Sequence, residues 1–375
     1  MRDVLPALLG WWQQGRTAAL ATVVGTWESA PRPAGAAMVV GPDGSVVGSL
    51  SGGCVEADVC ALAEEVLADG VPVLRRYGVS DGDALAVGLP CGGTVEVHVA
   101  AVSPATFPVL PAVAALVAAG EPVAVAVVVA ADDADRRGRH LVLRPDGPPV
   151  GGGLGSDRLD AAVTDDARGL LAAGRDELLT YGPDGERRGE GLQVFVTALA
   201  PRPRMLVFGA SEFAVALARM GTFLGHHVTV CDARGRFATP ARFPEADAVV
   251  VDWPHRYLAA EAAAGRLDGR TAVCVLTHDP KFDVPLLAAA LRLPLGYVGV
   301  MGSRRTHADR LERLRAEGLT EDQLARMASP LGLDLGARTP EETAVSIAAE
   351  LVSRRWGGAG RPLSEVSGRI HHGPR

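Results

Sequence analysis

The sequence predicts a two-part α/β protein, with a mixed α/β N-terminal half followed by a doubly wound parallel sheet. Three observations predict this fold. The chain has 375 residues, more than one hydrophobic core usually supports. Up to about residue 200, short apolar runs alternate with turns, which is typical of hairpins. After Arg204, apolar strands alternate with helical patterns, which is typical of a parallel sheet covered on both faces.

Composition narrows the possible partners and compartment. The chain carries 37 basic and 44 acidic residues, a net charge of −7, which argues against a non-specific nucleic-acid binder. The most apolar later segment, from Pro122, is about half the length needed to cross a bilayer. The five cysteines are odd in number and lack C-x₂-C zinc spacing, so a reducing compartment fits best. We therefore expect a cytoplasmic protein with neither a membrane nor a nucleic acid as partner.

The first predicted domain covers residues 1–105. The segment MRDVLPALLGWWQQGR predicts an opening helix, and the GPDG turn at 41–44 between apolar runs predicts a hairpin. Helical periodicity begins at Val55, and Gly70 is placed to end that helix. Strands are predicted at 71–77 and 94–102, with an irregular stretch between them. These elements predict one small α/β domain.

Residues 106–200 predict a helix, a long strand, a hairpin arm, a second helix and a hairpin around a second PDG turn. We interpret this region as an α/β scaffold that packs on the first domain and extends its sheet. No sequence repeat of fixed period is visible. The stiff segment APRPR at 200–204 is the best candidate linker.

Residues 204–356 predict the doubly wound domain, and 357–375 a C-terminal tail. The last predicted helix begins with Thr339, Pro340 and Glu342, which match an N-cap, a first-turn proline and a capping box. The first strand and helix of this domain contain the segment VFGASEFAVALA. It places Gly209, Ser211 and Ala214 where a Rossmann dinucleotide fingerprint has two glycines and a small residue.

A carboxylate follows this fingerprint at the spacing of a ribose ligand. Asp232 lies 23 residues after Gly209, at the end of the second predicted strand, and Arg234 is placed to favour an additional phosphate. Ser211 puts a hydroxyl where bare backbone normally meets pyrophosphate. Two interpretations stay open: a site for a nucleotide-like ligand, or a Rossmann scaffold whose site is degenerate or reused.

Two later strand ends add polar residues at the edge where open parallel sheets bind ligands. The segment THDPKFD supplies Thr277, His278 and Asp279, and the segment GSRRTH supplies Gly302, Ser303, Arg304 and Arg305. Backbone amides and two guanidinium groups at a helix start predict an anion site. His278 and Asp279 are a candidate acid–base pair, and a capping network is the alternative.

Two cysteines in the N-terminal half each stand beside paired glycines. One segment contains Ser51, Gly52, Gly53 and Cys54, and the other contains Cys91, Gly92 and Gly93. Cys54 lies at a predicted helix start, where the helix dipole favours thiolate, a soft ligand for metals and sulfur. Paired glycines let a bulky ligand approach the backbone. Together the two thiols would form a pocket with amide donors for a phosphate, whereas separately they would be small buried residues beside turns.

Six segments, in order along the chain, carry a family resemblance. GSLSGGCVEADV and GLPCGGTVEV belong to the N-terminal half, and VFGASEFAVALARMGTFLGHHVTVCDARGRFATPARFP, VLTHDPKFD, YVGVMGSRRTHADRLERL and LGLDLGARTPEETAVSIAAELV belong to the C-terminal half. With them the chain resembles the XdhC/CoxI family, accessory factors of molybdenum hydroxylases such as xanthine dehydrogenase. The resemblance implies an XdhC/CoxI-type N-terminal domain and a Rossmann domain. The family fingerprint usually reads G-x-G-x-x-A, so Ser211 is a departure from it.

The resemblance also implies a function. A protein of this family holds molybdenum cofactor, as molybdopterin or its cytosine dinucleotide form, and shields it while a cysteine desulfurase supports its sulfuration. It then delivers the cofactor to the large subunit of the hydroxylase, and a homodimer is expected. By carry-over, Cys54 and Cys91 are candidates for contact with molybdenum or its sulfur ligand. The rim around Gly209, Asp232 and Arg304 is the candidate for the pterin or nucleotide tail.

Two other classes of function stay open at this point. An NAD(P)-dependent oxidoreductase would hold its cofactor at Gly209 and Asp232 and use His278 as acid or base. A redox or nucleotide sensor would respond through Cys54 or Cys91 without a pterin. The resemblance favours a chaperone over a catalyst.

Overall fold

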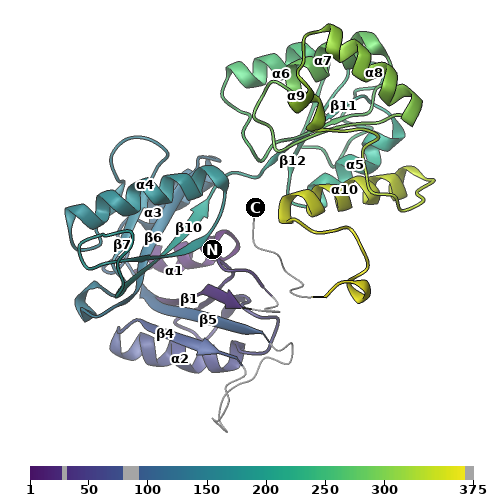
Figure 1. Cartoon of the computed structure of the whole chain (residues 1–375). Helices are drawn as coiled ribbons and strands as arrows, with labels where there is room; N and C mark the ends of the chain where they lie inside the picture. Colours follow the sequence, from purple (N-terminus) through teal and green to yellow (C-terminus); the bar gives the residue numbers. More distant parts are fainter. Residues whose placement is uncertain (28–31, 79–92, 368–375) are drawn as a thin grey trace. The chain divides into compact units, whose positions relative to one another are not determined.

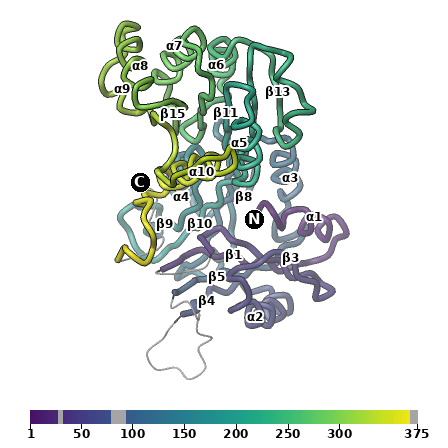
Figure 2. Tube along the Cα trace, turned by 90° about the vertical axis from the view of Figure 1, so that its right-hand side faces the viewer, coloured from purple at the N-terminus to yellow at the C-terminus, as the bar shows by residue number. Residues whose placement is uncertain are grey.

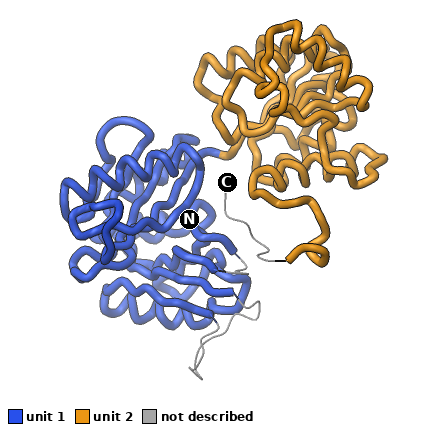
Figure 3. Tube along the Cα trace, viewed as in Figure 1, with its two compact units in different colours: residues 1–201 blue, residues 202–375 orange. Residues whose placement is uncertain are grey.

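A computed structural model describes residues 1–27, 32–78 and 93–367. The chain divides into two compact units, Met1–Pro201 and Arg202–Arg375 (Figure 3). The division falls inside the proline-containing segment 200–204. Among the described residues, no helix is long and apolar enough to cross a membrane.

The first half of the first unit forms a five-stranded antiparallel sheet with two α-helices. Its elements are η1 (Arg2–Val4), α1 (Leu5–Gln13), β1 (Ala18–Trp27), β2 (Ala37–Val40), β3 (Val46–Gly48), α2 (Glu56–Asp69), β4 (Val73–Tyr77) and β5 (Thr94–Val102), and the strand order is β3-β2-β1-β5-β4. The hairpin predicted at GPDG is confirmed, because β2 pairs antiparallel with β3. The predicted helix stop is also confirmed, since Gly70 caps α2 with φ +75°, a conformation that favours glycine.

The second half of the first unit, residues 110–199, forms a sheet of its own. Its elements are α3 (Leu110–Ala118), β6 (Val123–Ala131), η2 (Ala134–Arg136), β7 (His140–Leu143), β8 (Gly151–Gly152), α4 (Asp157–Ala173), β9 (Glu177–Tyr181) and β10 (Leu192–Leu199), and the strand order is β8-β7-β6-β10-β9. The predicted hairpin around the second PDG turn is confirmed, because β9 pairs with β10. The expectation that this region extends the first sheet is wrong, because the two sheets share no paired strand.

The two halves of this unit are a structural repeat. Element order and strand order are the same in both, apart from the single-turn 3-10 helices. The central strand pair of each half carries a register shift at the matching place. In the pair β1 and β5 the shift lies between Val23 and Gly25, and in the pair β6 and β10 it lies between Gln193 and Val194. Gly48 and Gly152 both have φ near +90°, and a Cβ on either would collide with the carbonyl oxygen of the neighbouring strand. We call residues 5–102 the first repeat and 110–199 the second repeat.

The repeats pack in layers (Figure 1, Figure 2). Helix α2 covers one face of the first sheet with an apolar cluster, and α4 covers one face of the second sheet in the same way. The other faces of the two sheets meet in a common apolar cluster to which α1 and α3 contribute. Each sheet therefore has one face against its own helix and one face toward the other repeat.

The second unit is a six-stranded parallel sheet with helices on both faces, as predicted. Its elements are β11 (Arg204–Phe208), α5 (Glu212–Phe223), β12 (His227–Cys231), β13 (Ala248–Val250), α6 (Pro254–Ala263), β14 (Ala272–Val275), α7 (Pro280–Ala290), β15 (Tyr297–Val300), α8 (Arg304–Ala316), α9 (Glu321–Ala325), β16 (Met327–Ala328), α10 (Pro340–Trp356) and η3 (Leu363–Glu365). The order β13-β12-β11-β14-β15-β16 is that of a doubly wound fold. The capping box of Thr339 and Glu342 is confirmed at the start of α10.

Candidate functional site

The loop before α2 closes around a single carboxylate, that of Glu56. Its two oxygens accept hydrogen bonds from five backbone N–H groups and two hydroxyls, at 2.7 to 3.1 Å. The donors are the N–H groups of Leu50, Ser51, Gly52, Gly53 and Val55 and the hydroxyls of Ser49 and Ser51. Successive amides that converge in this way form a nest for an anion. Here the nest is filled by the side chain of Glu56, the first residue of α2.

This arrangement fixes the charge of Glu56 and the shape of the loop. Burial alone would raise the pKa of Glu56, but the hydrogen bonds from Ser51, Ser49 and Leu50 outweigh burial and hold the pKa far below its usual range. Gly52 and Gly53 adopt φ of +87° and +120°, which side chains other than glycine rarely reach. The loop amides expected to face a phosphate are therefore bound to Glu56, a residue that the sequence analysis did not select. An acidic residue in the first helical turn after the glycine pair was the available signal.

Cys54 lies between this nest and the first turn of α2. Its backbone N–H donates to the Ser51 hydroxyl at 3.0 Å, its side chain is partly exposed, and the residue also packs against the core under the first sheet. Cys91 and Gly92 lie outside the described residues. Gly93 is buried just before β5. The meeting of the two cysteine segments stays a prediction.

The remaining described cysteines differ from Cys54. Cys231 and Cys274 are buried in the second unit, and burial raises the pKa of each thiol to about 12. Burial also raises the pKa of Cys60, which faces the core from α2. These three remain thiols near neutral pH and are poor ligands. Among residues 1–27, 32–78 and 93–367, no group of three or more His, Cys, Asp or Glu side chains is arranged to hold a metal ion.

In the second unit, Gly209 and Ser211 form the turn between β11 and α5. Gly209 has φ +108°, and a Cβ there would lie 3.0 Å from the Thr277 methyl carbon. Ser211 is the N-cap of α5, and its hydroxyl accepts from the Ala214 N–H at 3.4 Å. The serine that departs from the fingerprint thus caps the helix.

Asp232 lies at the end of β12, as predicted, but its carboxylate is already satisfied. One oxygen accepts from the Arg234 N–H and Nε, and the other accepts from the Ala210 N–H and from the Arg234 terminal nitrogen, at 2.8 to 3.0 Å. The carboxylate is 3% exposed, whereas the Arg234 side chain is 54% exposed. A ribose hydroxyl can therefore bond to Asp232 only after the Arg234 guanidinium moves away.

Thr277 supports a buried ion pair at the same sheet edge. Its hydroxyl donates to Asp283, and Arg310 donates to the other Asp283 oxygen at 3.3 Å and to the Met301 carbonyl at 3.1 Å. Both charged side chains are about 5% exposed. Burial raises the pKa of Asp283 against the opposing effects of Thr277 and Arg310. Arg310 could not be selected from the sequence, because an arginine inside a charged helical segment is typical of an exposed side chain.

The other predicted rim residues lie at two helix starts. Asp279 is the N-cap of α7 and pairs with the Lys281 ammonium at 3.1 Å, while His278 beside it is exposed. Ser303 is the N-cap of α8 and accepts from the Thr306 N–H at 3.1 Å. Arg304 and Arg305 follow Ser303 in the exposed first turn, and Gly302 precedes it. This end of α8 presents two cations at a helix N-terminus, which suits an anion.

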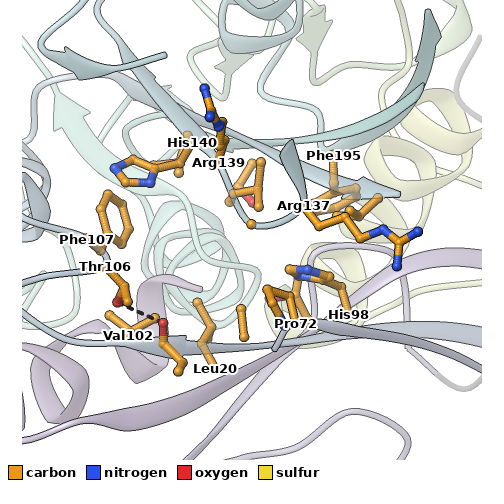
Figure 4. A pocket seen from close by; sticks show the side chains of 18 of the residues that line it. Leu20, Pro72, His98, Val102, Thr106, Phe107, Arg137, Arg139, His140 and Phe195 are labelled. Atoms are coloured by element: carbon orange, nitrogen blue, oxygen red, sulfur yellow. Dashed lines mark hydrogen bonds between the residues drawn. The ribbon is translucent and has the colours of Figure 1, made fainter. Parts of the chain in front are cut away.

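The first unit also contains a cavity that the sequence analysis did not predict. It has a volume of about 460 Å³ and lies between the two sheets (Figure 4). In Figure 4, Leu20 and His98 border it from the first repeat, and His140 and Phe195 border it from the second. Its walls come from β1, β5, β6 and β10, with Arg137 and Arg139 among the exposed residues that line it. Because residues about 100 apart in sequence form the walls, no local pattern points to it.

Comparison with known proteins gives two family matches. The model described as the XdhC Rossmann domain matches residues 205–351, and the model described as the XdhC and CoxI family matches residues 11–78 and 116–182. The last two ranges fall one in each repeat, and both run from the opening helix of the repeat to just beyond the strand that ends in Tyr77 or Tyr181.

Curated proteins and a solved structure resemble the chain over nearly its whole length. A probable xanthine dehydrogenase subunit of Bacillus subtilis is 28% identical, over 94% of this chain and 96% of its own. The molybdenum cofactor insertion chaperone PaoD of Escherichia coli is also 28% identical, over 91% of this chain and 84% of its own. The crystal structure of a xanthine dehydrogenase from Bacillus halodurans is 24% identical, with a TM-score of 0.69 over 97% of both chains, and supports the fold.

Proposed function

Because this chain belongs to the XdhC and CoxI family, we propose that it is an accessory factor that binds molybdenum cofactor and delivers it to a molybdenum hydroxylase. The names of its relatives support the proposal, since one is a molybdenum cofactor insertion chaperone and another a probable xanthine dehydrogenase subunit. Both relatives are matched over most of their length. The proposal therefore applies to the whole chain.

The single structural observation that carries the proposal is the loop held by Glu56. Seven hydrogen bonds to one carboxylate fix residues 49–55, so Cys54 stands in a defined position beside the start of α2. A partly exposed cysteine at a helix N-terminus suits a soft metal or sulfur ligand. We assign Cys54 to contact with molybdenum or its sulfur ligand, and extend the same role to Cys91.

The second unit fits the phosphate-bearing part of the cargo. Arg234, Arg304 and Arg305 are exposed cations at the rim of the parallel sheet, close to helix starts. We propose that this rim receives the phosphate of molybdopterin or the tail of its cytosine dinucleotide form. The proposal further includes support of the sulfuration of the cofactor together with a cysteine desulfurase, action as a homodimer, and delivery to the large subunit of the hydroxylase.

The bonding of Asp232 weighs against the alternative of an NAD(P)-dependent oxidoreductase. An NAD site of this fold uses a free carboxylate at this position for the ribose. Here four donors occupy that carboxylate, and Ser211 caps the helix where a second glycine would admit pyrophosphate. An oxidoreductase would have to break these contacts when the nucleotide binds.

Cofactor retention tests the proposal. The full chain is purified without air from a molybdenum-replete host, and molybdenum and pterin are measured by mass spectrometry and by fluorescence after oxidation. We expect both in near-stoichiometric amounts, and a loss of at least tenfold in the variant with Cys54→Ser and Cys91→Ser. Cys60→Ser, which changes a thiol that faces the core, is the matched control and retains the cofactor.

Two results would overturn these assignments. Unchanged retention in the double variant removes the role given to Cys54 and Cys91. Absence of pterin together with tight NAD(P)H binding and turnover replaces the chaperone with an oxidoreductase.

A further inference from the structure

The two repeats correspond position by position around the inter-sheet cavity. Tyr77 and Tyr181 end matching strands and pair with Val95 and Leu192. Val95 of β5 therefore corresponds to Leu192 of β10. Three residues further along each strand, His98 matches Phe195, and five residues further along, Ala100 matches Thr197. Thr22 pairs with His98 across the first sheet, and Val127 pairs with Phe195 across the second, so Thr22 matches Val127.

Three polar side chains line the cavity where the other repeat has an apolar one. His98, Thr22 and Thr197 are each more than nine-tenths buried. The Nε2 atom of His98 is buried and has no hydrogen-bond partner. The Thr22 and Thr197 side chains line the same cavity. Buried polar groups are normally hydrogen-bonded, because burial without a partner costs free energy.

Packing does not require these polar atoms. Phe195, Val127 and Ala100 fill the matching positions in the same fold, so an apolar residue is sufficient at each place. The free-energy cost of leaving the His98 Nε2 atom unpaired therefore calls for a partner that the protein alone does not supply. A bound molecule within the cavity provides one.

The chemistry of the walls defines that molecule. Valines, Leu20 and Phe195 make most of the wall apolar, which suits a flat ring. Among the described residues that line the cavity, the charged side chains are exposed and none is buried. Burial lowers the pKa of His98 to about 4, so its imidazole is neutral near pH 7 and has one donor and one acceptor nitrogen.

We propose that the cavity between the two sheets binds an uncharged nitrogen heteroaromatic ring, held by hydrogen bonds to His98, Thr22 and Thr197. A pterin ring and a purine ring share this chemistry. A volume of about 460 Å³ accommodates two fused rings with a substituent.

Calorimetric titration of the full chain with pterin, hypoxanthine and naphthalene tests this site. We expect pterin or hypoxanthine to bind at least tenfold more tightly than naphthalene. Tighter binding of pterin identifies a pterin-type ring, and tighter binding of hypoxanthine identifies a purine. Equal binding of all three, or of none, overturns the proposal and leaves an apolar or water-filled cavity.

Variants taken from the other repeat locate the binding. His98→Phe, Thr22→Val and Thr197→Ala each install the residue that the matching position already accepts. We expect His98→Phe to weaken binding of the preferred ring at least tenfold, and each threonine variant three- to tenfold. The matched control is His226→Phe, which removes a buried imidazole of the second unit whose Nδ1 atom has no hydrogen-bond partner. Unchanged affinity in all three cavity variants overturns the proposal.

Two further measurements separate failure of this site from other failures. Thermal unfolding shows whether His98→Phe is folded, and an unchanged or higher Tm is expected because an unpaired imidazole has been removed. Free-ring titration of the Cys54→Ser, Cys91→Ser variant should give wild-type affinity. That result keeps the ring site independent of the proposed thiol contact with molybdenum.

Discussion

The two repeats of the first unit have one backbone plan but differ in the side chains placed on it. Both have a helix that ends at a left-handed glycine, a tyrosine that ends the strand after that helix, and a bulge in the central strand pair. In both, a carboxylate accepts from the leucine N–H six residues before it, Leu50 to Glu56 and Leu154 to Asp160. These shared features are what the fold itself requires.

The differences lie in what the first repeat adds to this plan. The Glu56 carboxylate accepts from six further donors besides the amide of Leu50. In the described part of the chain, the Asp160 carboxylate accepts only from the matching amide of Leu154. Cys54 follows the glycine pair, and His98 stands where the second repeat has Phe195. Thr197 is a polar addition of the second repeat, where the first repeat has Ala100. Polar groups present in one repeat and absent from the matching place in the other are therefore the best candidates for function.

The largest expected difference between the repeats comes from removing the charge of the two carboxylates. Glu56→Gln leaves several donors without an ionised acceptor and should lower the free energy of unfolding by roughly 2–4 kcal/mol, since hydrogen bonds to charged groups are the stronger ones. Asp160→Asn loses one such bond and should cost about 1 kcal/mol. Urea unfolding of the full chain measures both. Equal losses would contradict the distinct role of the Glu56 nest.

A second difference between the repeats should appear in the pH dependence of stability. The pKa of His98 is about 4 in the folded protein against 6.5 as its ordinary value, because burial disfavours the imidazolium. Between these values the unfolded chain binds more protons, so stability is complete above pH 6.5 and falls as the pH falls toward 4. From pH 7 to pH 5 this one group should lower stability by about 2 kcal/mol.

His98→Phe isolates this effect. The variant gives the first repeat the phenylalanine of the second, so the contribution of His98 should vanish while all other titrating groups stay. Unfolding free energies of both proteins at pH 7 and pH 5 provide the measurement. An identical decrease in the two proteins would mean that His98 is not held neutral by burial.

The smallest expected difference concerns a feature that the repeats share. The Tyr77 hydroxyl donates to Asp58 at 2.7 Å, and the Tyr181 hydroxyl donates to Asp166 at 2.8 Å. Tyr77→Phe and Tyr181→Phe should each lower the free energy of unfolding by about 1 kcal/mol, and by nearly the same amount. Urea unfolding tests this, and a difference of more than about 1 kcal/mol would show that the two strand ends are not equivalent supports.

Local patterns predicted most elements of the fold. Apolar alternation, the GPDG turn and Gly70 placed the first sheet and α2, and strand–helix alternation placed the parallel sheet of the second unit. The repeat was not predicted, because sequence periodicity compares residue types at matching positions. Here those positions hold His98 and Phe195, or Thr22 and Val127, so the type changes while the backbone stays the same.

Part of the candidate site could also be predicted from sequence. Helix starts and strand ends are local features, so Cys54, Ser211 and Asp232 were correctly placed at them. The bonding partners were not predictable to the same degree. Asp232 could face a ribose or its own neighbours, and the structure bonds it to Ala210 and Arg234. Which donor reaches a carboxylate depends on loop geometry that residue types do not fix.

By itself the sequence determined where helices, strands and turns form, because those depend on side-chain period and on glycine and proline within a few residues. The tertiary structure decided three things. It joined the halves of the first unit as a repeat, turned the loop amides inward onto Glu56, and placed His98 opposite Phe195 around a cavity. These three features depend on loop geometry or on contacts between residues about 100 positions apart. Neither kind of contact produces a periodic pattern in the sequence.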